Sequence, residues 1–139
     1  MKKYYADDGA TLPAAELAVM NGIWLANEEL GRPVTTKEVI AHAPELAKVK
    51  MTTVLGRIEL LCEKGFIRIS KMNTGDRWNV YEVLVPHREY QSRAYREFVE
   101  KTMLGDRTEL AKMVLASMDP EEIAAAKEKV CLLYIARDI

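Results

Sequence analysis

The chain has 139 residues, of which 29% are charged and 49% are hydrophobic, and its formal net charge is −1. This length suits one folded domain with a smaller appendage, or one elongated unit. A membrane-spanning helix is excluded because no run of about 18 apolar residues occurs, and the Met-Lys-Lys-Tyr-Tyr start lacks the apolar stretch of a signal peptide. We therefore expect a cytoplasmic protein with no membrane partner.

The charged side chains are unevenly distributed. Residues 48–77 carry seven basic and three acidic side chains, a net charge of +4, whereas residues 1–47 have a net charge of −3. An electropositive segment in a slightly acidic chain is typical of a surface that binds nucleic acid. A solvated face on which cations cluster by chance explains the same pattern, so charge alone leaves both interpretations open.

Residues 1–11 indicate a flexible tail, and two helices follow it. The first helix begins after a Leu-Pro pair, and its helical spacing places on one face Leu17, Met20, Ile23 and Trp24. A Gly-Arg-Pro-Val break separates it from the second helix, for which Thr35 is the expected N-cap and Glu38 completes a capping box. Pro44 is expected to end or turn this second helix.

The segment KVKMTTVLGRIELLCEKGFI, residues 48–67, predicts a third helix with two different faces. At 100° per residue, one side is apolar and is expected in the core: Val54, Ile58, Leu61 and Cys62, with Leu55 at the edge. The other sides, and the chain just before the helix, carry polar or small residues: Lys48, Lys50, Thr52, Thr53, Gly56 and Arg57. Lys64 and Gly65 supply the cation and the glycine that are typical of a helix C-terminus.

The hydrophobic period then changes to that of strands. FIRISKM (66–72) and RWNVYEVLV (77–85) are rich in β-forming residues, and the polar sequence NTGD lies between them. Two strands joined by a short polar turn predict a β-hairpin that ends at Pro86. Lys71 and Arg77 flank the expected turn.

Three helical segments are predicted in the last third of the chain, at about 88–104, about 106–118 and from Pro120 onward. Asp119 is the expected N-cap of the last one, and Glu122 can close a capping box with it. Because three short amphipathic helices bury little apolar surface alone, we expect them to interleave with those of a second copy. The side chains expected in this homodimer interface are Tyr95, Phe98, Leu110, Met113, Val114, Ile123 and Val130.

The order helix, helix, helix, hairpin is that of a winged helix-turn-helix. The sequence therefore predicts a mainly α fold with a small β-hairpin, comprising a winged-helix domain at 12–86 and a helical dimerisation domain at 87–139. In such folds the third helix enters the DNA major groove by its N-terminal half. A two-fold dimer presents two such helices to successive grooves, which predicts a palindromic operator on double-stranded DNA.

Each residue proposed for DNA contact has a chemical reason. Thr52 and Thr53 can donate to phosphates or contact a thymine methyl group, and Arg57 can reach a guanine edge or a phosphate. A close approach of the backbone is permitted by Gly56. Cations that can pair with phosphates stand before the helix and beside the wing turn: Lys48, Lys50, Lys71 and Arg77.

Other interpretations of these residues remain open at this point. Thr52 and Thr53 are also suited to capping the helix. Arg57 is also suited to a surface ion pair, although the residues three and four positions from it are not acidic. Lys71 and Arg77 are also typical of a solvated hairpin end. The alternative function is that of a winged helix that binds another protein and no DNA.

Catalysis is not expected from this sequence. His42 and His87 are the only histidines, and neither has metal-ligand spacing to another histidine or a cysteine. No nucleophile motif or phosphate-binding glycine loop is present, so we expect no cofactor and no metal. Cys62 and Cys131 are far apart within helical patterns, which predicts reduced cysteines in the core and no disulfide.

Three segments together resemble the penicillinase-repressor family, the BlaI/MecI-type regulators. They are AAELAVMNGIW (14–24), TTVLGRIELLCEKGFI (52–67) and GDRWNVYEVLVPHREY (75–90). The resemblance implies a cytoplasmic dimeric transcriptional repressor that acts on palindromic operators. It also implies a DNA role for Thr53, which matches a threonine of the family's recognition helix.

Departures from the family pattern limit what the resemblance implies. Gly56 stands where relatives commonly have threonine and Leu60 where they commonly have arginine, which predicts a different operator sequence. The Asn-Phe pair at which β-lactam regulators are cleaved is missing from MVLASMDPEE (113–122), and Cys131 lacks the cysteine partner of copper-responsive relatives. Neither inducing signal transfers, so the upstream partner, a sensor or a protease, stays unidentified.

Overall fold

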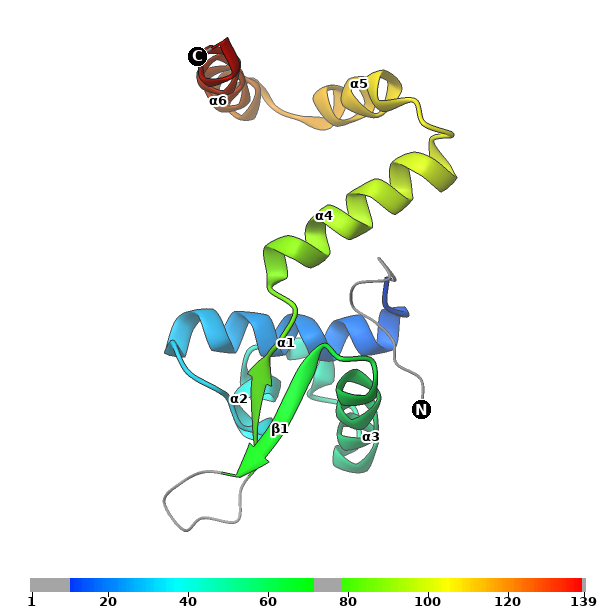
Figure 1. Ribbon diagram of the computed structural model, residues 1–139, viewed down its shortest axis with the longest axis vertical. Coiled ribbons are helices and arrows are strands. Elements are labelled where there is room, and N and C mark those ends of the chain that lie inside the picture. The colour runs from blue at the N-terminus through cyan, green and yellow to red at the C-terminus, as the bar shows by residue number, and fades with distance from the viewer. Residues whose placement is uncertain (1–10, 72–78, 139) are drawn as a thin grey trace. The chain divides into compact units, whose positions relative to one another are not determined.

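The computed structural model describes residues 11–71 and 79–138, with side chains described as far as residue 133. Contacts divide the chain into two units, Met1–Ala94 and Tyr95–Ile139, which are described separately (Figure 1). The predicted tail, residues 1–11, lies almost wholly outside the described residues. The predicted domain boundary at residues 86 and 87 stays a prediction.

Three helices form the first half of unit 1 at the predicted places. They are α1 (Ala14–Leu30), α2 (Thr36–Ala41) and α3 (Met51–Glu63), and a short 3-10 turn, η2 (Pro44–Leu46), leads from α2 toward α3. The predicted capping box is confirmed, because Thr35 Oγ1 accepts from the Glu38 N–H and the Glu38 carboxylate accepts from the Thr35 N–H. Gly65 follows α3 with φ +80°, a left-handed conformation that favours glycine.

Gly22 allows α1 and α2 to approach closely. A Cβ atom at this position would lie 2.8 Å from the carbonyl oxygen of Val39 and 3.0 Å from the Cβ of Ala43. Any larger residue would push the two helices apart. The glycine in the middle of α1 therefore sets the distance between α1 and α2, the helix that precedes α3.

A single apolar core joins the three helices to the hairpin. Its fully buried large side chains come from α1, η2, α3 and the hairpin: Met20, Ile23, Trp24, Leu46, Ile58, Leu61, Phe66, Ile67 and Tyr81. The apolar face predicted for α3 is confirmed at Val54, Ile58 and Leu61. Burial of these side chains removes apolar surface from water and fixes the core side of α3.

The hairpin is antiparallel, as predicted. Strand β1 (Ile67–Lys71) pairs with β2 (Asn79–Val83) in a register that runs from Ile67 opposite Val83 to Lys71 opposite Asn79. An isolated bridge joins Val34, between α1 and α2, to Tyr81 of β2. The predicted turn, together with Arg77, lies outside the described residues.

The chain leaves the hairpin along a joint that is anchored on α1. The indole N–H of Trp24 donates to the Val85 carbonyl at 2.9 Å, and its ring stacks on His87 with the centroids 4.5 Å apart. The Tyr90 hydroxyl accepts from the Leu12 N–H at 2.7 Å. The first turns of the next helix, α4 (His87–Glu97), therefore belong to unit 1.

The last part of the chain is helical, as predicted. A π-helical turn, η3 (Phe98–Thr102), follows α4, so the helix predicted at 88–104 changes its hydrogen bonding near its end. Helices α5 (Arg107–Ser117) and α6 (Pro120–Asp138) complete the fold, and Asp119 and Glu122 form the predicted reciprocal cap. Among the described residues, no helix is both long enough and apolar enough to cross a membrane.

The prediction for the cysteines is wrong in one respect. Cys62 is partly buried against the core, but Cys131 on α6 is exposed. The reason is that none of the α5 side chains, and none of the α6 side chains described as far as residue 133, is buried in the single chain. The helical pattern around Cys131 indicates a helix but does not decide what covers it.

Candidate DNA-binding surface

Helix α3 begins without a side-chain cap. Lys50 is its N-cap residue, in an extended conformation, and the N–H groups of Thr53 and Val54 donate to the Lys50 carbonyl. No side chain accepts a hydrogen bond at this end, so capping is not the role of Thr52 or Thr53. The first N–H groups of the helix therefore have no side-chain acceptor, and such groups suit an anion such as a phosphate.

The far end of α3 is tied to α1. Lys64 Nζ lies 2.5 Å from a carboxylate oxygen of Glu16, a glutamate that is almost fully buried. This ion pair, together with the apolar face, holds the helix at its C-terminal end. The helix is therefore held in place while the outer side of its N-terminal half stays available, and a binding surface requires such a rigid element.

The outer side of that half carries the residues predicted for base contact. Thr52, Thr53 and Gly56 are exposed, and Arg57 is half-buried. A Cβ atom at Gly56 would meet nothing within 4 Å, so no packing contact requires glycine there. Glycine inside a helix lowers stability relative to alanine. Its presence on this face is explained by a surface that another molecule approaches closely.

The structure sorts the basic residues of segment 48–77 into two groups. Lys64 is paired with Glu16, and Arg68 is paired with Glu82 across the hairpin at 2.5 Å. Within the described ranges no acidic partner is found for the others, Lys48, Lys50, Arg57 and Lys71. The unpaired cations are therefore those predicted to contact DNA, apart from Arg77, which is not described.

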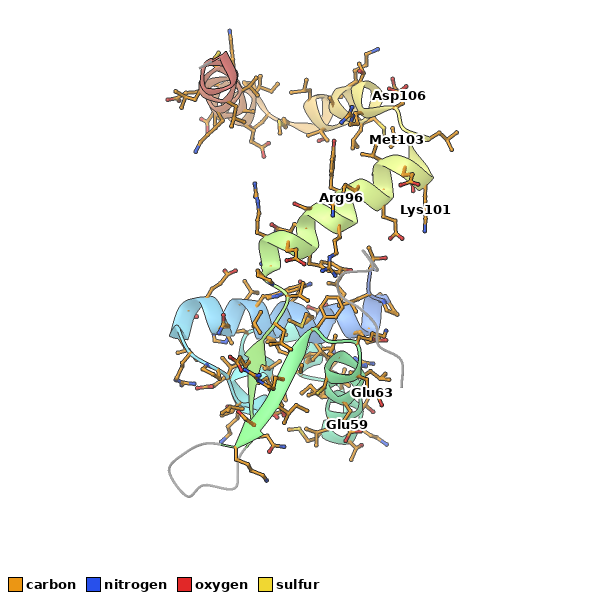
Figure 2. The ribbon with its side chains drawn as sticks, viewed as in Figure 1. Glu59, Glu63, Arg96, Lys101, Met103 and Asp106 are labelled. Atoms are coloured by element: carbon orange, nitrogen blue, oxygen red, sulfur yellow. The ribbon has the colours of Figure 1, made fainter. Side chains whose placement is uncertain are left out.

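Acidic residues occupy only the C-terminal half of the exposed side of α3. Figure 2 labels Glu59 and Glu63 there, and both are exposed. The N-terminal end of α3 and the end of β1 that leads to the wing lie on the side of the unit away from α1 (Figure 1). An anionic partner is therefore attracted to the N-terminal half and the wing, and repelled farther along the helix.

Three large apolar side chains on α3 were not predicted to belong to this surface. Met51, Leu55 and Leu60 have exposed fractions of 49%, 39% and 43%. Leu55, which the angular count placed at the edge of the core face, is exposed, whereas its neighbour Val54 is fully buried. The exposure of Leu55 could have been predicted from the angular count, because Leu55 lies 100° from Val54 on the helix.

Charged contacts also support α2, the helix that precedes α3. Arg32 donates two hydrogen bonds to the Glu38 carboxylate, and this lowers the pKa of Glu38 to about 2. His42 ends α2 with Nδ1 at 2.8 Å from the Glu38 carbonyl and Nε2 at 2.5 Å from a Glu29 oxygen. The backbone contact with Glu38 and the Glu29 carboxylate raise the pKa of His42.

Within residues 11–71 and 79–133, no three His, Cys, Asp or Glu side chains lie close enough together to hold a metal ion. The sequence model of the family described as penicillinase repressor matches residues 12–130. The chain belongs to the penicillinase repressor family. As a member of this family it is a DNA-binding transcriptional repressor, and the expectation that it is not an enzyme is confirmed.

Two further comparisons add little to the assignment to the penicillinase repressor family. A solved structure of mutant ZitR from Lactococcus lactis, in its apo form, is similar at 14% identity and a TM-score of 0.35. The match covers 88% of this chain and 85% of that one. No curated protein matches the chain.

Proposed function

We propose that this repressor acts as a homodimer on palindromic operators, with α3 in the major groove and the wing along the DNA backbone. Thr52, Thr53, Gly56 and Arg57 face the bases. Lys48, Lys50, Lys71 and Arg77 contact phosphates. The protein works in the cytoplasm, and its upstream partner, a sensor or a protease, stays unidentified.

One observation carries the DNA-reading part of this proposal. Among the described cations of segment 48–77, those without an acidic partner lie before α3, on the flank of its N-terminal half and at the end of β1. The two cations of this segment that make contacts within the fold, Lys64 and Arg68, are paired with Glu16 and Glu82. A winged helix that bound only proteins would have no reason to keep unpaired cations at the two places where DNA-binding winged helices meet phosphates.

The homodimer part rests on a different observation. Helix α5 buries no side chain in the single chain, although it carries several large apolar residues. Short helices are marginally stable without tertiary packing. A second copy supplies that packing and, by its two-fold symmetry, predicts operators with inverted half-sites about 10–10.5 base pairs apart, or multiples of that spacing.

A salt titration of binding to random duplex DNA tests the phosphate contacts. We expect log K to fall linearly with log salt concentration, with a slope of about −0.9 for each phosphate neutralised. Lys71→Ala should reduce the slope by about one per protomer. Absent binding at low salt, or binding that does not depend on salt, would overturn the DNA proposal and leave the protein-binding alternative.

Selection of bound fragments from a random DNA library tests the operator symmetry. Inverted repeats among the selected fragments support the dimer on a palindrome. Single, unrepeated half-sites contradict it. Fragments from the host genome, selected in the same way, identify the regulated genes.

A further inference from the structure

Leu104, between the π-helical turn and α5, is placed unusually for a leucine. Its exposed fraction is 87%, more than that of any other large apolar side chain that the structure describes. Its φ is +53°, and among the described residues it is the one non-glycine residue in the left-handed region. At this position a branched apolar residue has a strained backbone conformation, and its apolar side chain is exposed to water.

The packing of the single chain does not explain this residue. Glycine or asparagine adopts the same backbone at lower cost, and a polar side chain would suit the solvent. Gly105, which follows with φ +87°, shows that the chain uses glycine where the turn requires it. The side chain of Leu104 is therefore explained by a contact that one copy cannot make.

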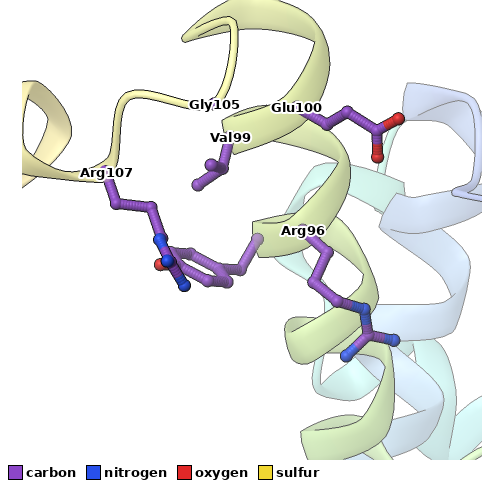
Figure 3. A pocket seen from close by; sticks show the side chains of 6 residues that line it. Arg96, Val99, Glu100, Gly105 and Arg107 are labelled. Atoms are coloured by element: carbon purple, nitrogen blue, oxygen red, sulfur yellow. The ribbon is translucent and has the colours of Figure 1, made fainter.

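A matching hollow lies beside it, within the same unit. It has a volume of about 310 Å3 and is lined by Tyr95, Arg96, Val99, Glu100, Gly105 and Arg107 (Figure 3). Val99 and Tyr95 supply its apolar surface. Leu104 does not fill this hollow, because its own side chain is almost fully exposed.

Charged side chains stand around the apolar part of the hollow. In Figure 3 the side chain of Arg107 lies on one side of Val99, and those of Arg96 and Glu100 lie on the other. None of these three has an ion-pair partner among the residues described. The edge of the hollow thus carries positive and negative groups that are available for pairing. A second copy of the chain, related by a two-fold axis, supplies the complementary groups.

We propose that Leu104 is the anchor of the homodimer and inserts into the hollow formed by Tyr95, Val99 and Arg107 of a second copy. Knob and hollow lie in the same unit, so one two-fold axis makes the contact twice. The contact buries two leucines and lets Glu100 of each copy pair with an arginine of the other. This inference rests on the homodimer proposed above and names the residues that form its central contact.

The backbone of the turn is built to hold this geometry. The Gly105 N–H donates to the Val99 carbonyl at 2.8 Å, and the Arg107 N–H donates to the Gly105 carbonyl at 3.1 Å. The same glycine thus fixes the floor of the hollow and the projection of Leu104. A small molecule that filled the hollow would leave Leu104 exposed, so it does not account for both observations.

The test is the dimer dissociation constant of the full chain, measured by sedimentation across a range of concentrations. Leu104→Asn keeps a side chain that tolerates left-handed backbone but removes the apolar anchor. Because each buried leucine is worth about tenfold in affinity and the dimer has two, we expect dimerisation to weaken by about one hundredfold. Leu104→Met, which keeps an apolar side chain, should remain close to the wild type.

Leu25→Asn is the matched control, since Leu25 is an exposed leucine of unit 1. It should leave the dimer unchanged. Mixed-isotope NMR should show contacts between the Leu104 methyl groups of one copy and the Tyr95 ring of the other. An unchanged dissociation constant for Leu104→Asn in a dimeric protein would overturn the inference. A wild-type chain that stays monomeric at every concentration would refute the homodimer itself.

Discussion

His42 Nε2 lies 2.5 Å from a carboxylate oxygen of Glu29, and the other ring nitrogen of His42 faces the backbone carbonyl of Glu38. Both neighbours are acceptors, so both ring nitrogens must carry protons to make the two hydrogen bonds. The geometry therefore favours the imidazolium form at the end of α2. The contacts with Glu38 and Glu29 both raise the pKa of His42 above its ordinary 6.5.

We expect NMR titration of His42 to give a pKa above 6.5 in the folded protein. The stabilisation from this group is complete below pH 6.5 and is lost as the pH rises through the raised pKa. Glu29→Gln keeps an acceptor oxygen but removes the charge, so it should lower the pKa of His42 without returning it fully to 6.5. A pKa of His42 that Glu29→Gln leaves unchanged would contradict the ion pair.

Glu38 predicts the opposite dependence on pH. The hydrogen bonds from Arg32 lower its pKa from 4.5 to about 2, so its stabilisation is complete above about pH 4.5 and is lost as the pH falls toward 2. Glu38→Gln retains an oxygen for the Thr35 N–H but removes the charge. The variant should be less stable than the wild type to urea at pH 7, and the difference should shrink below pH 4. A difference that stays constant with pH would show that the charge is not involved.

The sequence predicted the winged-helix fold because its signals are local. The capping boxes at Thr35 and Asp119 and the change from helical to alternating spacing after Gly65 each act within a few residues. The same local count identified the exposed polar face of α3. These features need no knowledge of distant contacts.

Other features depend on contacts between distant residues and were not predicted. The buried Glu16 is explained only by Lys64, which is 48 residues away, and the pairing of Arg68 with Glu82 depends on strand register. The exposure of Cys131 and Leu104 depends on how unit 2 packs, for which helical periodicity gives no information.

Gly56 and Gly22 should respond in opposite ways to replacement by alanine. Gly56→Ala should raise the free energy of unfolding by about 0.5–1 kcal/mol, because helix propensity improves and no atom obstructs the methyl group. It should also weaken operator binding if the backbone approaches DNA there. Gly22→Ala should lower stability by about 1–3 kcal/mol, because its Cβ would meet the Val39 carbonyl at 2.8 Å. Urea denaturation measures both. Gly56→Ala with undiminished operator affinity would refute the close approach.

Arg57 and Arg68 form a matched pair for testing which cations read DNA. Both lie in the electropositive segment, but only Arg68 has an acidic partner in the described chain. Arg57→Ala should weaken binding to the selected operator by about 1–3 kcal/mol and relax the preference at one base pair. Arg68→Ala should change affinity little. Competition binding against single-base operator variants measures both effects. A uniform loss of affinity over all sequences would restrict Arg57 to a phosphate contact.

Met51 and Leu55 lie one turn apart on the flank of α3 opposite to Arg57, and both are exposed. On a helix in the major groove, such side chains are suited to thymine methyl groups, the apolar feature of that groove. This prediction rests on the proposed placement of α3. We expect replacement of one operator thymine by deoxyuridine, which removes only the methyl group, to weaken binding by about 0.8 kcal/mol. Leu55→Ala should weaken binding to the thymine operator but abolish the difference between the two DNAs.

The double-mutant cycle separates a methyl contact from a general effect of Leu55 on the helix. If Leu55 contacts the methyl group, the two changes are not additive, because either one removes the same contact. Leu60→Ala on the opposite flank is the control and should preserve the thymine effect at that position. Fully additive losses at every thymine of the operator would show that Leu55 supports the helix without reading the base. Operator binding that is equally tight with and without every thymine methyl group would exclude methyl recognition by Met51 as well.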